Sequence, residues 1–296
     1  MKPFAFVSAK DAWHAVALLA KHGPAVRIVA GGTDLLPELK SSAEKLDAII
    51  DISQASDFTG IAVTGEGLRI GARATHSDIV RSPVVRELCP ALADAVRTIG
   101  AVQTRNLGTI GGNLMNGVPS MDSGPVLLAL DAWVTIAGPD GRQRLPLSDL
   151  FVGPRKTSLR FDQLLLDIVI PKDNLGKPAA FLKFGLRKGQ ALALVNVAAA
   201  FWIDRNANGF RDPRVALGAV APTVMRAVRA EAFLQGATIT PASMIEAGQI
   251  AAAEARPITD FRASAEYRRY LITVLTKRAL QCAHARAEAQ SREYSR

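Results

Sequence analysis

Residues 104–132 read TRNLGTIGGNLMNGVPSMDSGPVLLALDA, and the rest of the chain is organised around this stretch. At its centre two adjacent glycines lie between a hydroxyl and an amide side chain, in the order Thr109, Ile110, Gly111, Gly112 and Asn113. Such glycines leave backbone N–H groups uncovered, so a phosphate-bearing ligand could approach them closely. The stretch has neither the GxGxxG spacing typical of dinucleotide-binding folds nor the GxxxxGK spacing, followed by Ser or Thr, typical of P-loops. The pattern predicts a loop that forms one wall of a phosphate-binding site.

A second glycine pair, nearer the N-terminus, repeats this chemistry after an apolar run over residues 26–30. Its residues are Val29, Ala30, Gly31, Gly32, Thr33, Asp34 and Leu35. In chain order we call residues 29–35 the first glycine segment and residues 109–113 the second. A single Gly-Gly pair most often only makes a tight turn. Two such segments in one chain predict two walls around one diphosphate.

Both segments, with their neighbours, match a known pattern. AGGTDL followed by Pro, and TIGGN followed by Pro, Asp and LLAL, resemble the flavin-binding medium subunit of the molybdenum hydroxylases, a family that includes carbon monoxide dehydrogenase and xanthine dehydrogenase. The resemblance covers nearly the whole chain. It also includes LLDIVIP at residues 165–171, the run 181–183 with Arg187, and Ala-Pro-Thr at 221–223 leading to Arg226, Glu231 and Gly236.

The resemblance implies an α+β fold in which two α/β subdomains enclose FAD (PCMH-like), followed by a C-terminal domain of a small antiparallel sheet and helices. We predict an N-terminal subdomain over residues 1–57 and a middle subdomain over 58–172. The polar, turn-rich run 173–178 then leads to a C-terminal domain over 177–288.

The family's cofactor contacts carry over to individual positions. The resemblance implies that Val29, Ala30, Gly31, Gly32, Thr33, Asp34, Leu35, Thr109, Ile110, Gly111, Gly112, Asn113, Asp122, Leu165 and Lys183 bind FAD. Three of these have ordinary alternatives: Asp122 could cap a helix before Pro125, Lys183 could be a solvated strand lysine, and Leu165 could be a core leucine. A lysine beside the flavin would stabilise negative charge on the reduced ring.

The chain departs from the family at two places. Ile99 lies where some relatives place an aromatic residue over the isoalloxazine, and Gln190 with Ala191 lies where some carry an acidic residue and a tyrosine. The resemblance therefore leaves the contacts on the flavin faces and the electron acceptor open.

No catalytic triad or paired-carboxylate set can be picked from the sequence, which fits a protein that positions a redox cofactor. The resemblance implies an oxidoreductase subunit that accepts electrons from the 2Fe–2S clusters of a small subunit and passes them to an external acceptor. A large subunit would carry the molybdopterin cofactor, in a heterotrimer or a dimer of heterotrimers. The alternatives are a stand-alone flavin oxidoreductase and a non-enzymatic basic scaffold.

The amino-acid composition argues against nucleic-acid binding. The 36 Lys and Arg exceed the 27 Asp and Glu, for a net charge of +9, but there is no long basic run and aromatic residues are only 6%. We therefore expect no nucleic-acid binding. The basic residues after position 262 are interpreted as a solvated helix face, with docking to an acidic subunit as the alternative.

Metal ligands and targeting signals are also scarce. Only two cysteines and four histidines are present, so we expect no metal in this chain and two thiols that behave as small apolar residues. No signal peptide or membrane span is visible, which predicts a cytoplasmic protein.

Periodicity and turn residues predict the regular elements. Helices are expected over 9–22, with Ser8 as its cap, and over 90–99, 126–130, 225–235, 241–255 and 263–287. Strands are expected over 26–30, 48–52, 68–72, 133–137, 164–170, 181–186, 194–203 and 214–220. In the last helix, the stripe Tyr267, Tyr270, Leu271, Val274, Leu275 and Cys282 is predicted to face the core.

Overall fold

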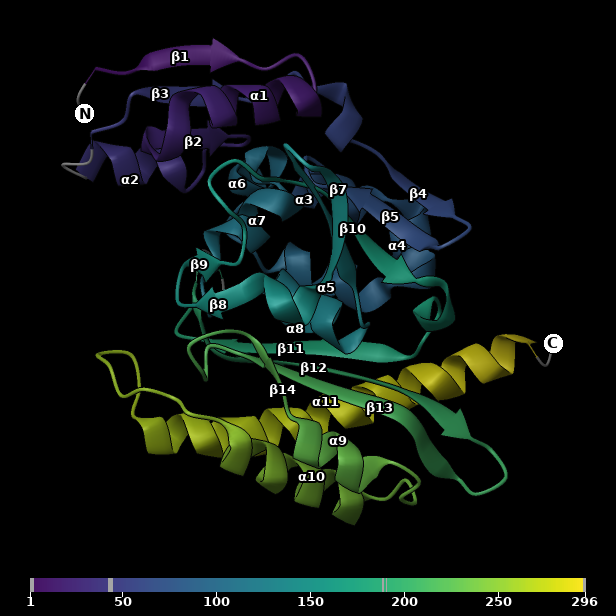
Figure 1. Cartoon of the computed structure of the whole chain (residues 1–296). Helices are drawn as coiled ribbons and strands as arrows, with labels where there is room; N and C mark the ends of the chain where they lie inside the picture. The colour runs from purple at the N-terminus through teal and green to yellow at the C-terminus, as the bar shows by residue number, and fades with distance from the viewer. Residues whose placement is uncertain (1–2, 42–44, 188, 190, 295–296) are drawn as a thin grey trace.

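The computed structural model describes residues 3–41, 45–187, 189 and 191–294. Three sheets of three to five strands follow one another along the chain, with one further two-stranded sheet, and the long C-terminal helix crosses the lower part of the molecule (Figure 1). Helices and strands are mixed throughout, and the last third is an antiparallel sheet with three helices. The predicted α+β class is therefore confirmed.

The N-terminal part is a three-stranded parallel sheet in the order β1-β3-β2. Its elements are β1 (Ala5–Ser8), α1 (Ala12–His22), β2 (Val26–Val29), α2 (Leu35–Ser41) and β3 (Ala48–Asp51). The predicted start of α1 is wrong, because Ser8 ends β1 and the Asp11 side chain caps the helix, accepting the His14 N–H at 2.8 Å. β1 was not predicted, since this short edge strand leaves Ala5, Phe6 and Ser8 exposed.

The middle part is a five-stranded sheet, β4-β5-β10-β6-β7, in which every neighbouring pair is antiparallel. Its strands are β4 (Ile61–Thr64), β5 (Gly67–Gly71), β6 (Trp133–Gly138), β7 (Gly141–Pro146) and β10 (Leu164–Pro171), beside the small pair β8 (Phe151–Gly153) and β9 (Lys156–Thr157). Its helices are α3 (His76–Arg81), α4 (Pro83–Leu88), α5 (Pro90–Arg97), α6 (Val102–Leu107), α7 (Ile110–Asn116) and α8 (Ser123–Ala129). Apolar residues of β5 and β10 share one core with these helices.

The second glycine segment is helical. Thr109 is the N-cap of α7, and its hydroxyl accepts the Gly112 N–H at 3.0 Å. The prediction of an open loop was wrong here because two glycines weaken a helix signal by about 1 kcal/mol each. The Thr109 cap and the burial of Ile110 and Leu114 offset that cost.

The C-terminal sheet, β11-β12-β13-β14, is covered on both faces. Its strands are β11 (Ala179–Gly185), β12 (Ala193–Asp204), β13 (Gly209–Gly218) and β14 (Met225–Arg226), and its helices are α9 (Val228–Leu234), α10 (Pro241–Glu254) and α11 (Ala265–Tyr294). Ala198 and Ala200 face the core of the middle part, whereas Val197 and Ala199 face α10 and α11. Burial on both faces explains why residues 197–201 of β12 are all apolar.

The three predicted C-terminal helices are present, but the first begins later than expected because Met225 belongs to β14. The predicted core stripe of α11 is only partly right. Leu271 and Leu275 are buried, whereas Tyr267, Tyr270 and Cys282 are exposed. The two tyrosine rings stack on each other instead, with centroids 6.4 Å apart.

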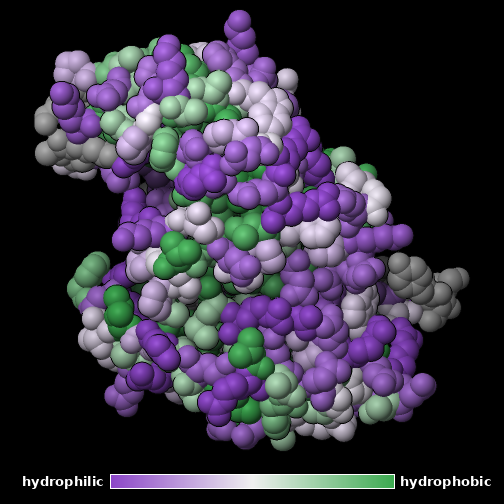
Figure 2. Space-filling view, viewed as in Figure 1, coloured by the Kyte–Doolittle hydropathy of each residue, from purple (hydrophilic) through white to green (hydrophobic). Residues whose placement is uncertain are grey.

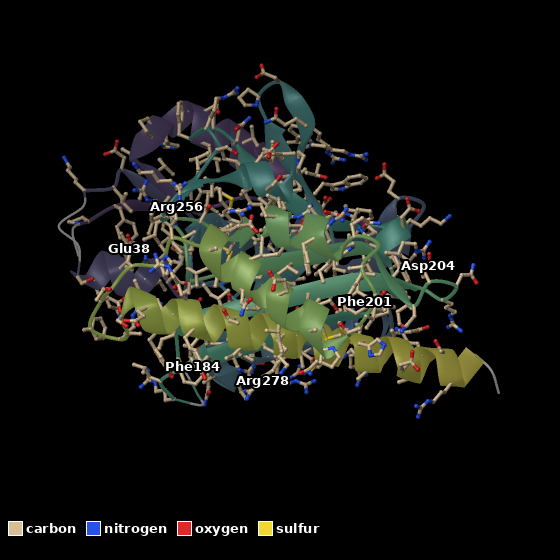
Figure 3. All side chains as sticks on the ribbon, turned by 90° about the horizontal axis from the view of Figure 1, so that it is seen from below. Glu38, Phe184, Phe201, Asp204, Arg256 and Arg278 are labelled. Atoms are coloured by element: carbon tan, nitrogen blue, oxygen red, sulfur yellow. The ribbon has the colours of Figure 1, made fainter. Side chains whose placement is uncertain are left out.

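The basic residues of α11 do not form one solvated face. Arg268 is buried and donates to Asp260 at 2.9 Å and to the Leu194 carbonyl at 2.6 Å. Arg286 pairs with Asp94 of α5 and so ties the helix to the middle part. Arg278 remains exposed and lies on the same side of α11 as Phe184 (Figure 3).

The two cysteines differ in environment. Cys89 is buried, which raises the pKa of its thiol to about 12, whereas Cys282 is exposed and does not behave as a core residue. Within the described ranges, no three His, Cys, Asp or Glu side chains are grouped to hold a metal ion. In the same part of the chain, no helix combines the length and apolar character needed to cross a bilayer.

Candidate cofactor site

A cavity of about 750 Å³ lies where the first glycine segment faces the second. The cavity lies between the N-terminal part, which we call the N-terminal lobe, and the rest of the molecule. The surface is indented between these two parts (Figure 2). The predicted site residues that line it are Val29, Ala30, Gly31, Gly32, Thr33, Asp34, Leu35, Thr109, Gly111, Gly112, Asn113, Asp122, Leu165 and Lys183. Ile110 does not line it, because its side chain is fully buried in the core beneath α7. Ile99 and Ala191 also border the cavity, and Gln190 lies outside the described residues.

The first glycine segment offers free hydrogen-bond donors. Within the described chain, the N–H groups of Gly31, Gly32, Thr33 and Asp34 make no hydrogen bond. Gly31 is also required sterically, because a Cβ there would lie 1.9 Å from the Leu107 carbonyl oxygen. Gly32 has a φ of +68°, a conformation that favours glycine. This segment therefore presses against the middle part while keeping its donors available.

The second glycine segment also contains a Gly-Gly pair and a threonine, but its backbone N–H groups are differently bonded. Ile110 and Gly111 donate to the carbonyls of Ala74 and Ala72 at 3.0 and 2.9 Å, and Gly112 donates to Thr109 Oγ1. The prediction that both glycine pairs supply free donors is therefore wrong for this one. A Cβ on Gly111 would lie 2.7 Å from Ala72, so this glycine permits close packing of α7 on the strand end.

Asp122 and Lys183 form a buried ion pair at the cavity wall. Asp122 also accepts hydrogen bonds from Thr98 Oγ1 and from Asn196 Nδ2, both at 2.9 Å. Burial raises the pKa of Asp122, and the facing Lys183 ammonium, with the bonds from Asn196 and Thr98, opposes that rise. Neither ordinary alternative holds: the Asp122 side chain makes no helix-cap bond, and the Lys183 side chain is only 11% exposed.

Leu165 lies in β10, where the register against β6 shifts between Leu165 and Asp167. It is 2% exposed yet borders the cavity, so it acts both as a core residue and as an apolar wall. The core alternative and the cofactor prediction are therefore compatible at this position.

Several cavity residues were not predicted from the sequence, among them Arg155, Phe161 and His76. Arg155, in the turn between β8 and β9, pairs with Glu38 of α2 at 2.8 Å and joins the middle part to the N-terminal lobe. Phe161 is an exposed aromatic residue at the cavity rim. His76 begins α3 and is almost fully buried. No local pattern marks any of them, because each reaches the cavity through the tertiary packing.

Comparison with known proteins gives the same family over the whole chain. Residues 2–173 match the FAD binding domain in molybdopterin dehydrogenase, and residues 180–283 match the CO dehydrogenase flavoprotein C-terminal domain. The predicted subdomain boundary near residue 57 stays a prediction.

Individual relatives agree. The chain is 31% identical to the carbon monoxide dehydrogenase medium chain of Hydrogenophaga pseudoflava, over 96% of this chain and 98% of that one. It is 32% identical to the xanthine dehydrogenase FAD-binding subunit of Escherichia coli O157:H7, over 92% and 93% of the two chains.

A solved structure shares the fold. The structure is similar to that of carbon monoxide dehydrogenase from H. pseudoflava lacking the Mo-pyranopterin moiety, with a TM-score of 0.92, 33% identity, and coverage of 97% of this chain and 99% of that one. Two glycine segments facing one cavity, the Lys183–Asp122 pair and both family domains in order lead to one conclusion: the chain belongs to the family of FAD-binding medium subunits of molybdenum hydroxylases.

Proposed function

We propose that this chain holds FAD between its two glycine segments and passes electrons from a partner subunit to an external acceptor. The observation that carries the proposal is a cavity of about 750 Å³ with unbonded N–H donors on one wall. Ligand pockets in proteins commonly measure about 300–1,000 Å³. Bound FAD would supply the electron-carrying chemistry, and the chain would position it.

The residues present fit such a ligand in different ways. The N–H groups of Gly31, Gly32 and Thr33 would hold the diphosphate, because converging backbone donors are suited to anions. Gly111 and Gly112 would let the ligand approach the backbone closely, but would not donate hydrogen bonds to it, because their N–H groups are bonded within the protein. Leu165 and Ile99 would form apolar walls for the ring system.

Asp122 would act through Lys183. Its two carboxylate oxygens already accept from Lys183, Thr98 and Asn196, so its main effect is to keep the Lys183 ammonium in place. A fixed cation beside the flavin would favour negative charge on the reduced ring. Asp122 would thus contribute to FAD binding indirectly, through the position of Lys183.

The partners follow from the family. Related chains are medium chains of the multi-subunit carbon monoxide dehydrogenase and nicotine 6-hydroxylase. We infer that this chain assembles with a large molybdopterin-binding subunit and a small 2Fe–2S subunit as a heterotrimer or a dimer of heterotrimers. We place the complex in the cytoplasm. The large subunit would determine the substrate.

Purification of the chain alone and with its partner subunits tests the proposal. We expect a flavin absorption spectrum, release of FAD on heating, and iron–sulfur absorbance only when the partners are present. A colourless protein that takes up no FAD on reconstitution would contradict it. Turnover of a small molecule by the isolated chain would instead favour a stand-alone flavin oxidoreductase.

A further inference from the structure

His76 is held in place by its backbone at the junction of the two glycine segments. Its N–H donates to the Gly108 carbonyl at 3.0 Å, and Thr75 caps α3 through a reciprocal pair of bonds with Asp78. A Cβ added to Gly108 would lie 3.3 Å from Thr33 Oγ1 and 3.4 Å from His76 Cδ2. The imidazole therefore lies close to the first glycine segment, where the free N–H donors are.

Among the residues that the structure describes, none hydrogen-bonds the side chain of His76. It is 2% exposed and borders the cavity, and its Nδ1 is buried without a hydrogen bond. No described group bonds its Nε2 either. Buried polar atoms are normally satisfied, so an unsatisfied one at a cavity wall requires an explanation. A leucine would fill this space without that cost.

The imidazole is neutral at physiological pH. Burial and the nearby Arg105 guanidinium lower the pKa of His76 to about 4. A neutral imidazole carries one N–H donor and one acceptor nitrogen. The donor suits the oxygens of a phosphate, which have no proton to give and need converging N–H groups.

We propose that His76 is a positioning residue for the cofactor, and that its imidazole donates a hydrogen bond to the diphosphate part of FAD beside Thr33. The inference rests on the proposed function, since it needs FAD in this cavity. It adds a side-chain donor to the backbone donors of the first glycine segment. One ring nitrogen of His76 would then gain a hydrogen-bond partner in the loaded protein.

The dissociation constant of FAD in His76→Leu and His76→Gln tests this role, measured by flavin fluorescence on the apo full-length chain. We expect His76→Leu to weaken FAD binding about tenfold or more, because a bond to a charged acceptor is lost. His76→Gln keeps an N–H donor and should recover part of the affinity. The matched control is His14→Leu, since His14 lies at a partly exposed position on α1 and is absent from the cavity lining.

A thermal melt of each apo variant separates this role from a merely structural one. We expect His76→Leu to melt at or above the temperature of the unsubstituted chain, because an unsatisfied buried group is removed. An apo protein that melts lower, with unchanged FAD affinity, would overturn the inference. If the unsubstituted chain binds no FAD, the proposed function itself fails, and the two failures are thus distinguishable.

Discussion

The two glycine segments have similar sequences and different structures. In the first, the N–H groups of Gly31 and Gly32 are free and the backbone presses against Leu107. In the second, the glycine N–H groups bond to Ala72 and Thr109, and the glycines allow α7 to pack tightly. The comparison teaches that a Gly-Gly pair marks a place where the backbone is closely approached. Whether a ligand or another part of the protein approaches it depends on whether the glycine N–H groups are already hydrogen-bonded within the protein.

The largest effect should come from Gly31→Ala. Its new Cβ would lie 1.9 Å from a backbone oxygen of the middle part, which cannot move aside like a side chain. We expect unfolding in denaturant to show a loss of about 3 kcal/mol or more, with loss of FAD binding. The matched control is Gly65→Ala, since no atom lies within 4 Å of a Cβ at Gly65. Normal stability of Gly31→Ala would mean that the N-terminal lobe does not press on Leu107.

Lys183→Met tests the ion pair with Asp122 at the cavity wall next to the second glycine segment. The two are connected there, because Asn113 of that segment accepts a hydrogen bond from Ser123, the neighbour of Asp122. The substitution leaves a buried carboxylate without its cation, so we expect a loss of about 3 kcal/mol. Adding Asp122→Asn should recover much of this loss, and Lys172→Met, at an exposed lysine, should be neutral. Denaturant unfolding of the unsubstituted chain, Lys183→Met, Asp122→Asn and the double variant measures the coupling, and additive effects would show that the pair does not interact.

The pH dependence of the free energy of unfolding tests the environment of His76, which lies where the two glycine segments meet. Unfolded His76 takes up a proton below about pH 6.5, whereas folded His76 resists protonation down to about pH 4. The unfolded state binds more protons in this window, so stability should fall as the pH falls from 6.5 to 4 and then level off. The full effect is about 3 kcal/mol. His76→Gln should flatten this part of the curve, and an unchanged slope would show that another group titrates there.

Gly112→Ala should have the smallest effect on folding. Its Cβ would meet only the Thr109 hydroxyl, at 3.0 Å, and alanine favours the helix by about 1 kcal/mol over glycine. We expect a stability change within about 1 kcal/mol and several-fold weaker FAD binding, because the methyl group would occupy the cavity. Unchanged FAD affinity would mean that the cofactor does not approach the second segment closely.

Much of the fold could be predicted because its main strands are apolar runs between turn residues. β2, β3, β10 and β12 all begin within one residue of the predicted start, since buried apolar residues make up at least half of each strand. β1 and α7 were missed for opposite reasons. β1 is exposed and carries no burial pattern, and α7 is a helix whose first turn contains two poor helix formers.

The site was harder to predict than the fold. The sequence motifs correctly predicted that both glycine segments border one cavity. They could not reveal that the Gly111 N–H is already bonded to the Ala72 carbonyl. The partner of Lys183 also had to come from the structure, because Asp122 is 61 residues away in sequence. Contacts of this kind arise from packing between distant segments and leave no local pattern.

The buried charge pair also bears on how this family could be recombined. Asp122 belongs to the stretch that matches the first family domain, whereas Lys183 and Asn196 belong to the second. A chimaera that joined this N-terminal portion to a C-terminal portion without an equivalent lysine would inherit an unmatched buried charge. An exchange of either domain would therefore have to preserve both members of this ion pair at the wall that the two domains share.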